Sequence, residues 1–320
     1  MYICCKPIPT LILENDTAVK ARSVGGFTMK RAGAVKFPNS VQLFKFCQKV
    51  LMHQRGAKVR DQEIGNILEF NPSDCSHWKR GEKNVKSVFA LAKLAETLQV
   101  EAALVHDVAS GNSNLDEAYF EFQETKAFRE ALQKVRTADP AATEQSRQRI
   151  EQFVAALHEG SEFRTPPLYL PEVLRTFSFI NSQPIEMLDR LSRILRVRPG
   201  QYTIQYKKGD MRPQTRMSVV KDLARIVFEA ERARFPELGP VNPATLEFEE
   251  MLFAANLLIP KNMLLSEMAK IDLRRNAVSE LATLFWVPKS LISFQMQDSV
   301  RVSATAIGTA ATANAASASF

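Results

Sequence analysis

Residues 64–81 have the sequence IGNILEFNPSDCSHWKRG, which carries the strongest structural signal in the chain. Two short helices that cross must come into close contact, and a small residue such as Gly65 permits this. Asn71 can cap the second helix with its side-chain oxygen. Cys75 and Trp78 are three residues apart, so both would point from one helix face toward a core. The stretch therefore predicts two short helices joined by a tight turn.

The second of these helices would leave a polar surface free, because only Cys75 and Trp78 turn inward. Basic side chains stand at its end, where the phosphates of a bound nucleic acid would pass. Pro72 suits its first position. The candidate DNA-binding residues are Asn71, Pro72, Ser73, Asp74, Ser76, His77, Lys79, Arg80 and Lys83. A helical bundle of the same shape that does not bind DNA is the alternative.

This region resembles the XRE, or Cro/repressor-like, helix-turn-helix family. The resemblance runs without a gap through residues 64–81 and continues over SVFALAKLAETLQV, residues 87–100, as the next helix. The helical period of that segment places Val88 on the inner face. The family resemblance implies that the second helix enters the major groove of DNA, with Ser73 and His77 near base edges and Pro72 beside them.

Two positions depart from the pattern of the resembled family. Glu69 stands at the turn, where Gly is usual, and Lys79 stands where Glu is usual. Pro72 and Ser73 also offer fewer hydrogen bonds to bases than Gln, Arg or Asn would. These departures imply modest sequence specificity.

The overall charge and composition agree with a globular protein that has an anionic partner. A formal charge of +7 in 320 residues favours double-stranded DNA. No apolar run approaches the roughly 20 residues that a membrane span needs, and no signal peptide is recognised. Cysteines 4, 5, 47 and 75 match neither a disulfide framework nor a zinc knuckle. We therefore expect a cytoplasmic protein without membrane attachment.

Five segments are expected along the chain. Residues 1–37 form a flexible basic arm, 38–104 the helix-turn-helix domain, 105–164 a helical connector suited to dimerisation, 165–298 a second domain, and 299–320 a disordered tail. Inside the second domain, ILRVRPGQYTIQYKKGD alternates like two strands, and helical patterns surround it. The predicted fold class is mainly α with a small β-sheet (α+β).

A second stretch, RMSVVKDLARIVFE at residues 216–229, has the outline of a zinc-peptidase helix but contains no histidine. In such a helix, His-Glu-x-x-His places two imidazoles on one face to bind Zn²⁺, and the Glu serves as base. The second domain resembles the ImmA/IrrE metallopeptidase family here, and again over EFEEMLFAANLLIP, residues 247–260. This resemblance implies a zincin-like fold.

The resemblance places residues that cannot bind zinc at the metal positions. Lys221 and Arg225 replace the two histidines, Asp222 replaces the catalytic Glu, and only Glu247 matches a ligand position. Arg has no lone pair to offer a metal and stays protonated at any useful pH. We therefore expect a pseudo-peptidase, with no enzyme activity, no metal and no cofactor.

Three hypotheses address the charges that replace the metal site. In the first, Lys221 and Arg225 both face Glu247 and Glu249 or Glu250. The Arg225 guanidinium then stands in for the metal and holds the later helix through a bidentate pair. In the second, these charges form a solvated face. In the third, the former cleft is a pocket for an anion or a peptide.

Together these features predict a sequence-specific, repressor-like transcriptional regulator that acts as a homodimer. Its C-terminal domain would sense a protein or small-ligand effector, or support dimerisation. The alternative is a protein–protein adaptor or antitoxin-like control protein. A zinc metallopeptidase is a third class, and it would need ligands that the sequence lacks.

Overall fold

The computed structural model describes residues 35–137, 139–161, 163–187, 190–209, 211–272 and 276–299. The described residues from Lys36 onward belong to one unit. The basic arm expected over 1–37 and the tail expected over 299–320 lie outside the described residues, apart from 35–37 and 299. The fold is mainly helical with one three-stranded sheet, so the predicted fold class is confirmed.

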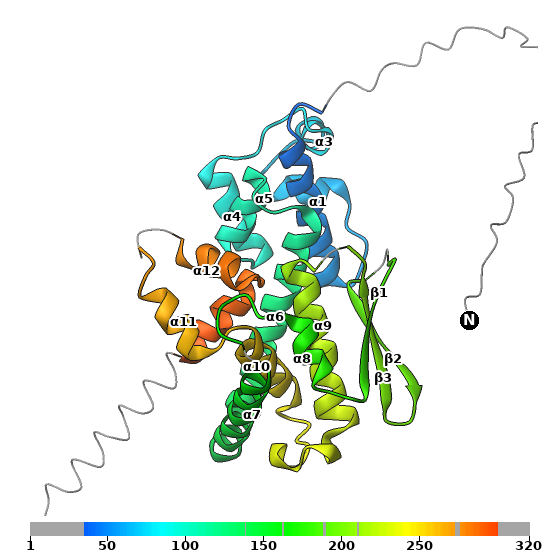
Figure 1. Ribbon diagram of the computed structural model, residues 1–320. Coiled ribbons are helices and arrows are strands. Elements are labelled where there is room, and N and C mark those ends of the chain that lie inside the picture. Colours follow the sequence, from blue (N-terminus) through cyan, green and yellow to red (C-terminus); the bar gives the residue numbers. More distant parts are fainter. Residues whose placement is uncertain are drawn as a thin grey trace, which may run out of the picture. The chain divides into compact units, whose positions relative to one another are not determined.

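Helices enclose a first core in the N-terminal part, which we call the head, residues 38–122 (Figure 1). Trp78 is fully buried there beside Phe44, and Leu94 and Val105 are also buried in this core. The helices of the head are α1 (Pro38–Arg55), α2 (Asp61–Ile67), α3 (Pro72–Arg80), α4 (Val88–Leu98), α5 (Ala102–Ser110) and the first half of α6 (Leu115–Thr137).

Helix α6 belongs to two cores. Ala118 and Phe122 pack in the core of the head, whereas Phe128 and Val135, further along the same helix, pack in the second core. The boundary expected at residue 104 therefore falls inside the head, and the connector expected over 105–164 is not a separate segment. Helices α6 and α7 (Pro140–Gly160) are rich in charged residues, but each also has a narrow apolar face. These apolar faces are buried against the cores.

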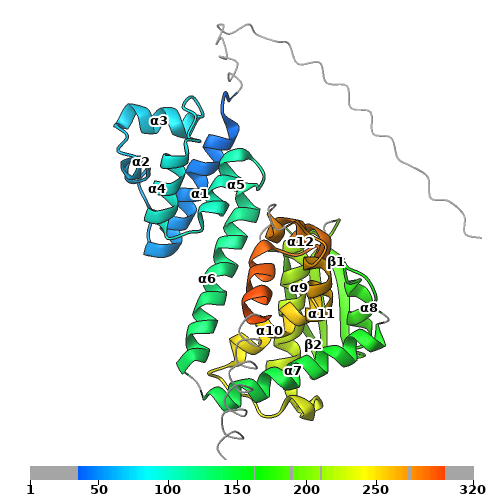
Figure 2. The same ribbon diagram turned by 90° about the vertical axis from the view of Figure 1, so that its left-hand side faces the viewer.

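The second core lies in the body, residues 128–299, behind a three-stranded sheet of order β1-β3-β2. Strands β1 (Ile180–Ile185) and β3 (Gln201–Lys207) are parallel, and β2 (Ser192–Arg198) is antiparallel to β3. The two strands expected within residues 194–210 are confirmed as β2 and β3. Helix α9 (Pro213–Arg225) packs on β2 and β3, and both views show it beside the sheet (Figures 1 and 2).

Further helices complete the body. α10 (Leu246–Leu258) is buried along almost its whole length and packs between α7 and α9. A π-helical turn, η1 (Ile226–Ala230), continues α9. The remaining elements are α8 (Leu170–Arg175), η2 (Arg232–Arg234), η3 (Pro236–Leu238), α11 (Lys261–Met268), α12 (Ala277–Phe285) and a last helical segment at 289–299. Among the described residues, no helix combines the length and apolar character that crossing a bilayer requires.

Candidate nucleic-acid interface

The crossing of α2 and α3 depends on a close approach at Gly65. A Cβ atom on Gly65 would lie 2.8 Å from Cβ and 2.9 Å from Sγ of Cys75. Contacts this short are not tolerated in packed proteins, so only glycine fits here. The expectation that Gly65 permits the two helices to cross is confirmed.

The turn between these helices is a Schellman motif with an unusual residue. The backbone N–H groups of Phe70 and Glu69 donate to the carbonyl oxygens of Gly65 and Asn66, at 3.0 and 3.1 Å. Glu69 holds a left-handed backbone with φ 58°, the conformation that this motif requires and glycine adopts most easily. The position where the resembled family has Gly therefore keeps the same backbone shape without Gly.

Helix α3 begins and packs as the sequence predicts. The side-chain oxygen of Asn71 accepts a hydrogen bond of 2.8 Å from the N–H of Asp74, and Pro72 occupies the first turn. Trp78 donates from Nε1 to the carbonyl oxygen of Ser40 at 2.8 Å. Its ring meets that of Phe44 edge-on, with the centroids 5.1 Å apart. These contacts fix α3 against α1 and determine which side of α3 faces outward.

The predicted DNA-contacting residues do lie on the outer side of α3. Cys75 and Trp78 are buried, whereas Pro72, Ser73 and Ser76 are exposed and His77 is partly exposed. Asn71, Lys79 and Arg80 are also exposed, and Asp74 and Lys83 are partly exposed. Helix α3 thus presents a continuous polar surface from its first turn to its last.

The basic residues at the end of α3 are already paired with acidic residues of the head. Lys79 lies 2.5 Å from Asp61, and Lys83 lies 2.8 Å from Asp74. Both His77 and Arg80 contact Glu82, and hydrogen bonds from them hold the pKa of Glu82 below its usual value. A nucleic-acid phosphate would have to displace a carboxylate to reach each of these cations. The sequence did not reveal this pairing.

Two large apolar side chains stand uncovered at the start of α4. Ser87 caps this helix by accepting a hydrogen bond of 3.2 Å from Ala90. Val88 and Phe89 follow in the first turn and are 77% and 88% exposed. The inward position expected for Val88 is therefore wrong, because the helix turns its inner face to the core only from Leu91 onward.

The second candidate region is helix α9, in which Lys221, Asp222 and Arg225 make different contacts. Lys221 donates to both carboxylate oxygens of Glu124 on α6, at 3.0 Å each. Asp222 accepts a hydrogen bond of 2.6 Å from the hydroxyl of Ser192 on β2. Burial raises the pKa of Asp222, and the Ser192 hydrogen bond opposes this rise.

Arg225 does not pair with Glu247, so the first hypothesis for these charges is wrong. Its guanidinium is about half exposed and lies 3.7 Å from Asp222 on the preceding turn. Glu247 instead accepts a hydrogen bond of 2.6 Å from Lys134 on α6. The reason is geometric: Glu247 is in the first turn of α10, on the side that faces α6.

The other two glutamates considered as partners behave differently from each other. Glu249 is buried and bonded to Arg232 at 2.7 Å and to the hydroxyl of Thr245. Glu250 is buried with no hydrogen-bond partner for Oε1. Burial, and then the charge of Glu229, raise the pKa of Glu250 to about 7. A carboxyl in this setting is protonated over much of the acidic range.

The surroundings of α9 offer no set of donors suited to a zinc ion. Lys221 and Arg225 carry protons on every side-chain nitrogen when charged, so neither offers a lone pair. Within the part of the chain that the structure describes, no three His, Cys, Asp or Glu side chains come together as metal ligands would. The arrangement is that of a packed helix whose charges hold neighbouring elements.

We compared the chain with family models, with curated proteins and with solved structures, and none of them matches it.

Proposed function

We propose that this protein is a DNA-binding transcriptional regulator whose body is a non-catalytic, peptidase-like domain. The observation that supports the proposal most directly is α3 itself. A Schellman turn and an Asn71 cap hold it, buried Cys75 and Trp78 orient it, and its polar side faces outward. This is the geometry that the helix-turn-helix family uses to place a helix in the major groove.

The proposed partners follow from this geometry. One short helix reads only a few base pairs, so a homodimer on paired half-sites would supply the rest of the specificity. Phosphate contacts by Lys79, Arg80 and Lys83 would make the affinity depend on salt. We place the protein in the cytoplasm, where its free buried thiols Cys47 and Cys75 would stay reduced.

Mobility-shift assays test the proposal. The probe is DNA from upstream of the protein's own gene, bound at several salt concentrations. A Ser73→Ala, His77→Ala double variant should lose preference for its site over unrelated DNA. Ser266→Ala, on exposed α11 in the body, is the matched control and should bind as the wild type does. No binding by the wild type even at low salt would contradict the proposal.

A protein–protein adaptor or antitoxin-like control protein is the second candidate function. The observation that favours it is the pairing of every basic residue at the end of α3 with a carboxylate of the head. Such pairing reduces the positive potential that attracts DNA. Failure to bind DNA, together with specific binding of another protein to the exposed Val88 and Phe89, would select this function.

Zinc peptidase activity is the third class, and the contacts of α9 do not favour it. Lys221 is occupied by Glu124, and Asp222 is held by Ser192. Elemental analysis of the purified protein gives a direct measure. If the wild type contained one zinc per chain and lost it when Asp222 and Glu247 were replaced by Ala, the result would support the zinc-peptidase hypothesis.

A further inference from the structure

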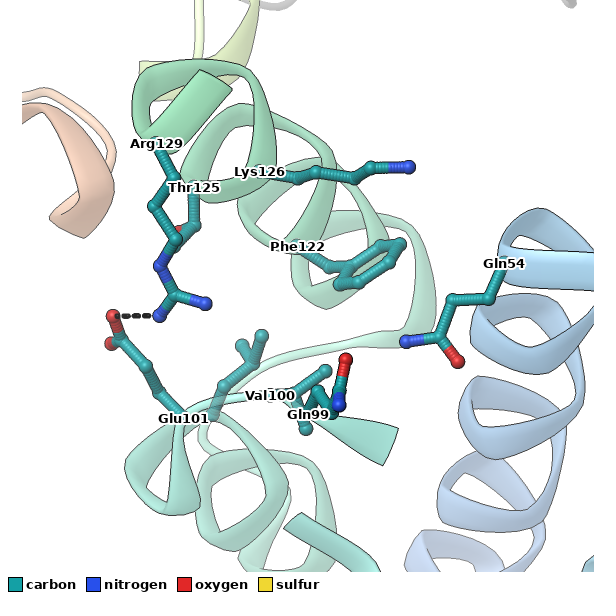
Figure 3. Close-up of a pocket in the computed structure, with 9 residues that line it drawn as sticks. Gln54, Gln99, Val100, Glu101, Phe122, Thr125, Lys126 and Arg129 are labelled. Atoms are coloured by element: carbon teal, nitrogen blue, oxygen red, sulfur yellow. Dashed lines mark hydrogen bonds and ion pairs between the residues drawn. The ribbon is translucent and has the colours of Figure 1, made fainter. Parts of the chain in front are cut away.

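A cavity of about 410 Å³ lies between the end of α1, the turn that joins α4 to α5, and the middle of α6 (Figure 3). Pockets that hold small molecules are commonly about 300–1,000 Å³ in volume. The cavity is remote in sequence from the outer side of α3, and none of the residues proposed to touch DNA lines it.

One wall of the cavity is apolar and flat. Phe122 of α6 is only 6% exposed, and its ring stands at the centre of the close-up, facing the space (Figure 3). Val100 and Leu104, from the turn and from α5, pack against the same core and extend this wall. A planar aromatic group would bury its face here and gain from stacking as well as from loss of water contact.

Two cations of α6 stand above this wall and are loosely held. Arg129 reaches Glu101 only at 3.4 Å, and both side chains are more than half exposed. Lys126 lies 3.3 Å from Nε2 of His53 and 3.9 Å from Glu130. Long, exposed pairs of this kind contribute little free energy, so both side chains can turn to a new anion.

The charges of the lining residues leave a positive excess. Arg129 and Lys126 are the two lining cations and Glu101 is the one lining carboxylate. Arg129 reaches toward Glu101, whereas Lys126 points away from it, toward His53 (Figure 3). A ligand with a single carboxylate would neutralise this excess. A guanidinium binds a carboxylate through two parallel hydrogen bonds, which also fixes the direction of the ligand.

We propose that this cavity binds a small aromatic carboxylate, with its ring against Phe122 and its carboxylate on Arg129 and Lys126. The bound ring would also touch the α4–α5 turn, so it would hold α6 against that turn. The site does not depend on DNA binding by the head. A neutral aromatic molecule of equal size gains the apolar contact but not the ionic one.

Calorimetric titration of the full chain with 2-naphthoate tests the proposal, and 2-naphthalenemethanol is the neutral counterpart. We expect the carboxylate to bind about tenfold more tightly than the alcohol, since a charge-assisted hydrogen bond is worth about that much in affinity. No heat of binding with millimolar 2-naphthoate, or equal affinities for the two compounds, would overturn the proposal.

Variants locate the binding. Arg129→Gln and Lys126→Gln should each weaken 2-naphthoate by part of that tenfold preference, about threefold each, and leave the alcohol unchanged. Arg129 is more than half exposed and Lys126 is partly exposed, so neither change should unfold the head, and thermal melts check this. Lys86→Gln, an exposed lysine of the same head outside the cavity, should bind as the wild type does. If all three variants weaken binding equally, or none does, the carboxylate is not held at this cavity.

Discussion

Lys221 of α9 donates to both carboxylate oxygens of Glu124 of α6, 97 residues earlier in the chain, at 3.0 Å each. Lys221 and Glu124 thus form a clamp between two helices. Both side chains are largely buried, at 19% and 10% exposure, so solvent screens the pair only partly.

Removing one member of this clamp should destabilise the protein. Lys221→Met leaves Glu124 buried without its cation, which typically costs about 3 kcal/mol for a buried pair. The double variant Lys221→Met, Glu124→Leu removes both charges and should recover most of that loss. Chemical denaturation measures the free energy of unfolding. A Lys221→Met variant as stable as the wild type would show that the clamp contributes nothing.

Gly65→Ala should destabilise the head, because its Cβ would meet Cβ of Cys75 at 2.8 Å. Overpacking of this kind costs about 1–3 kcal/mol. Gly160→Ala, at the end of α7, is the matched control, since nothing lies within 4 Å of its Cβ. That change should be neutral or stabilise by up to about 1 kcal/mol. Equal melting temperatures for the two variants would contradict the close crossing of α2 and α3.

Glu69→Gly should stabilise the turn before α3. A left-handed backbone costs a non-glycine residue about 1–2 kcal/mol. The exposed Glu69–Lys93 pair that is lost contributes less than this, because solvent screens it. Glu69→Gln keeps the strained backbone and loses the charge, so it should be slightly less stable than the wild type. Melting temperatures rank the stability of the wild type and the two variants. If Glu69→Gly had the lowest melting temperature, the predicted relief of backbone strain would be refuted.

Stability should fall as the pH rises from about 4.5 to about 7, in part because of Glu250. Its pKa is raised from 4.5 to about 7 in the folded protein, so in this window the folded state binds more protons than the unfolded state. Deprotonating a buried carboxyl then opposes folding, by about 3 kcal/mol at most. Burial raises the pKa of Asp222 as well, which adds to the same trend.

Glu250→Gln removes the titrating group and keeps the shape, so its free energy of unfolding should depend less on pH between about 4.5 and 7. It should exceed that of the wild type at pH 8 and approach it at pH 4.5. Glu237→Gln, an exposed glutamate of the same body, is the control and should follow the wild type. Parallel pH curves for Glu250→Gln and the wild type would rule out a contribution from Glu250.

Val88 and Phe89 should contribute to self-association if the protein is the homodimer proposed above. Large apolar side chains this exposed gain free energy when a partner covers them, and burying one phenylalanine is worth about 1.5–3 kcal/mol. Val88→Ser with Phe89→Ser should therefore raise the dimer dissociation constant about tenfold or more. Sedimentation measures this, with Leu265→Ser, an exposed leucine of the body, as control. Unchanged association would place the dimer contact elsewhere.

Features that depend on residues close together in the sequence could be predicted, because neighbouring residues determine them. Gly65, Asn71 and Trp78 act within the turn and the helices next to it, and each behaves as its residue type and spacing suggested. The hairpin of β2 and β3 was visible for the same reason: its alternation and its turn lie within 17 consecutive residues.

Features that depend on contacts between residues far apart in the sequence could not be predicted. Strand β1 is short and polar and contains Pro184, which an edge strand tolerates, so it shows no alternating pattern. The partner of Lys221 comes from a helix nearly a hundred residues away, and no spacing rule links the two. The predicted pairing of Arg225 with Glu247 is wrong. A sequence motif gives the order of residues along the chain, but it does not give the direction in which each side chain points.

Because α6 supplies side chains to both cores, the protein cannot be cut cleanly into exchangeable modules. A fragment that stops at residue 104 would lack Ala118 and Phe122, and one that begins at 165 would lack Phe128 and Val135. A transplant of the head onto another protein must include the first half of α6.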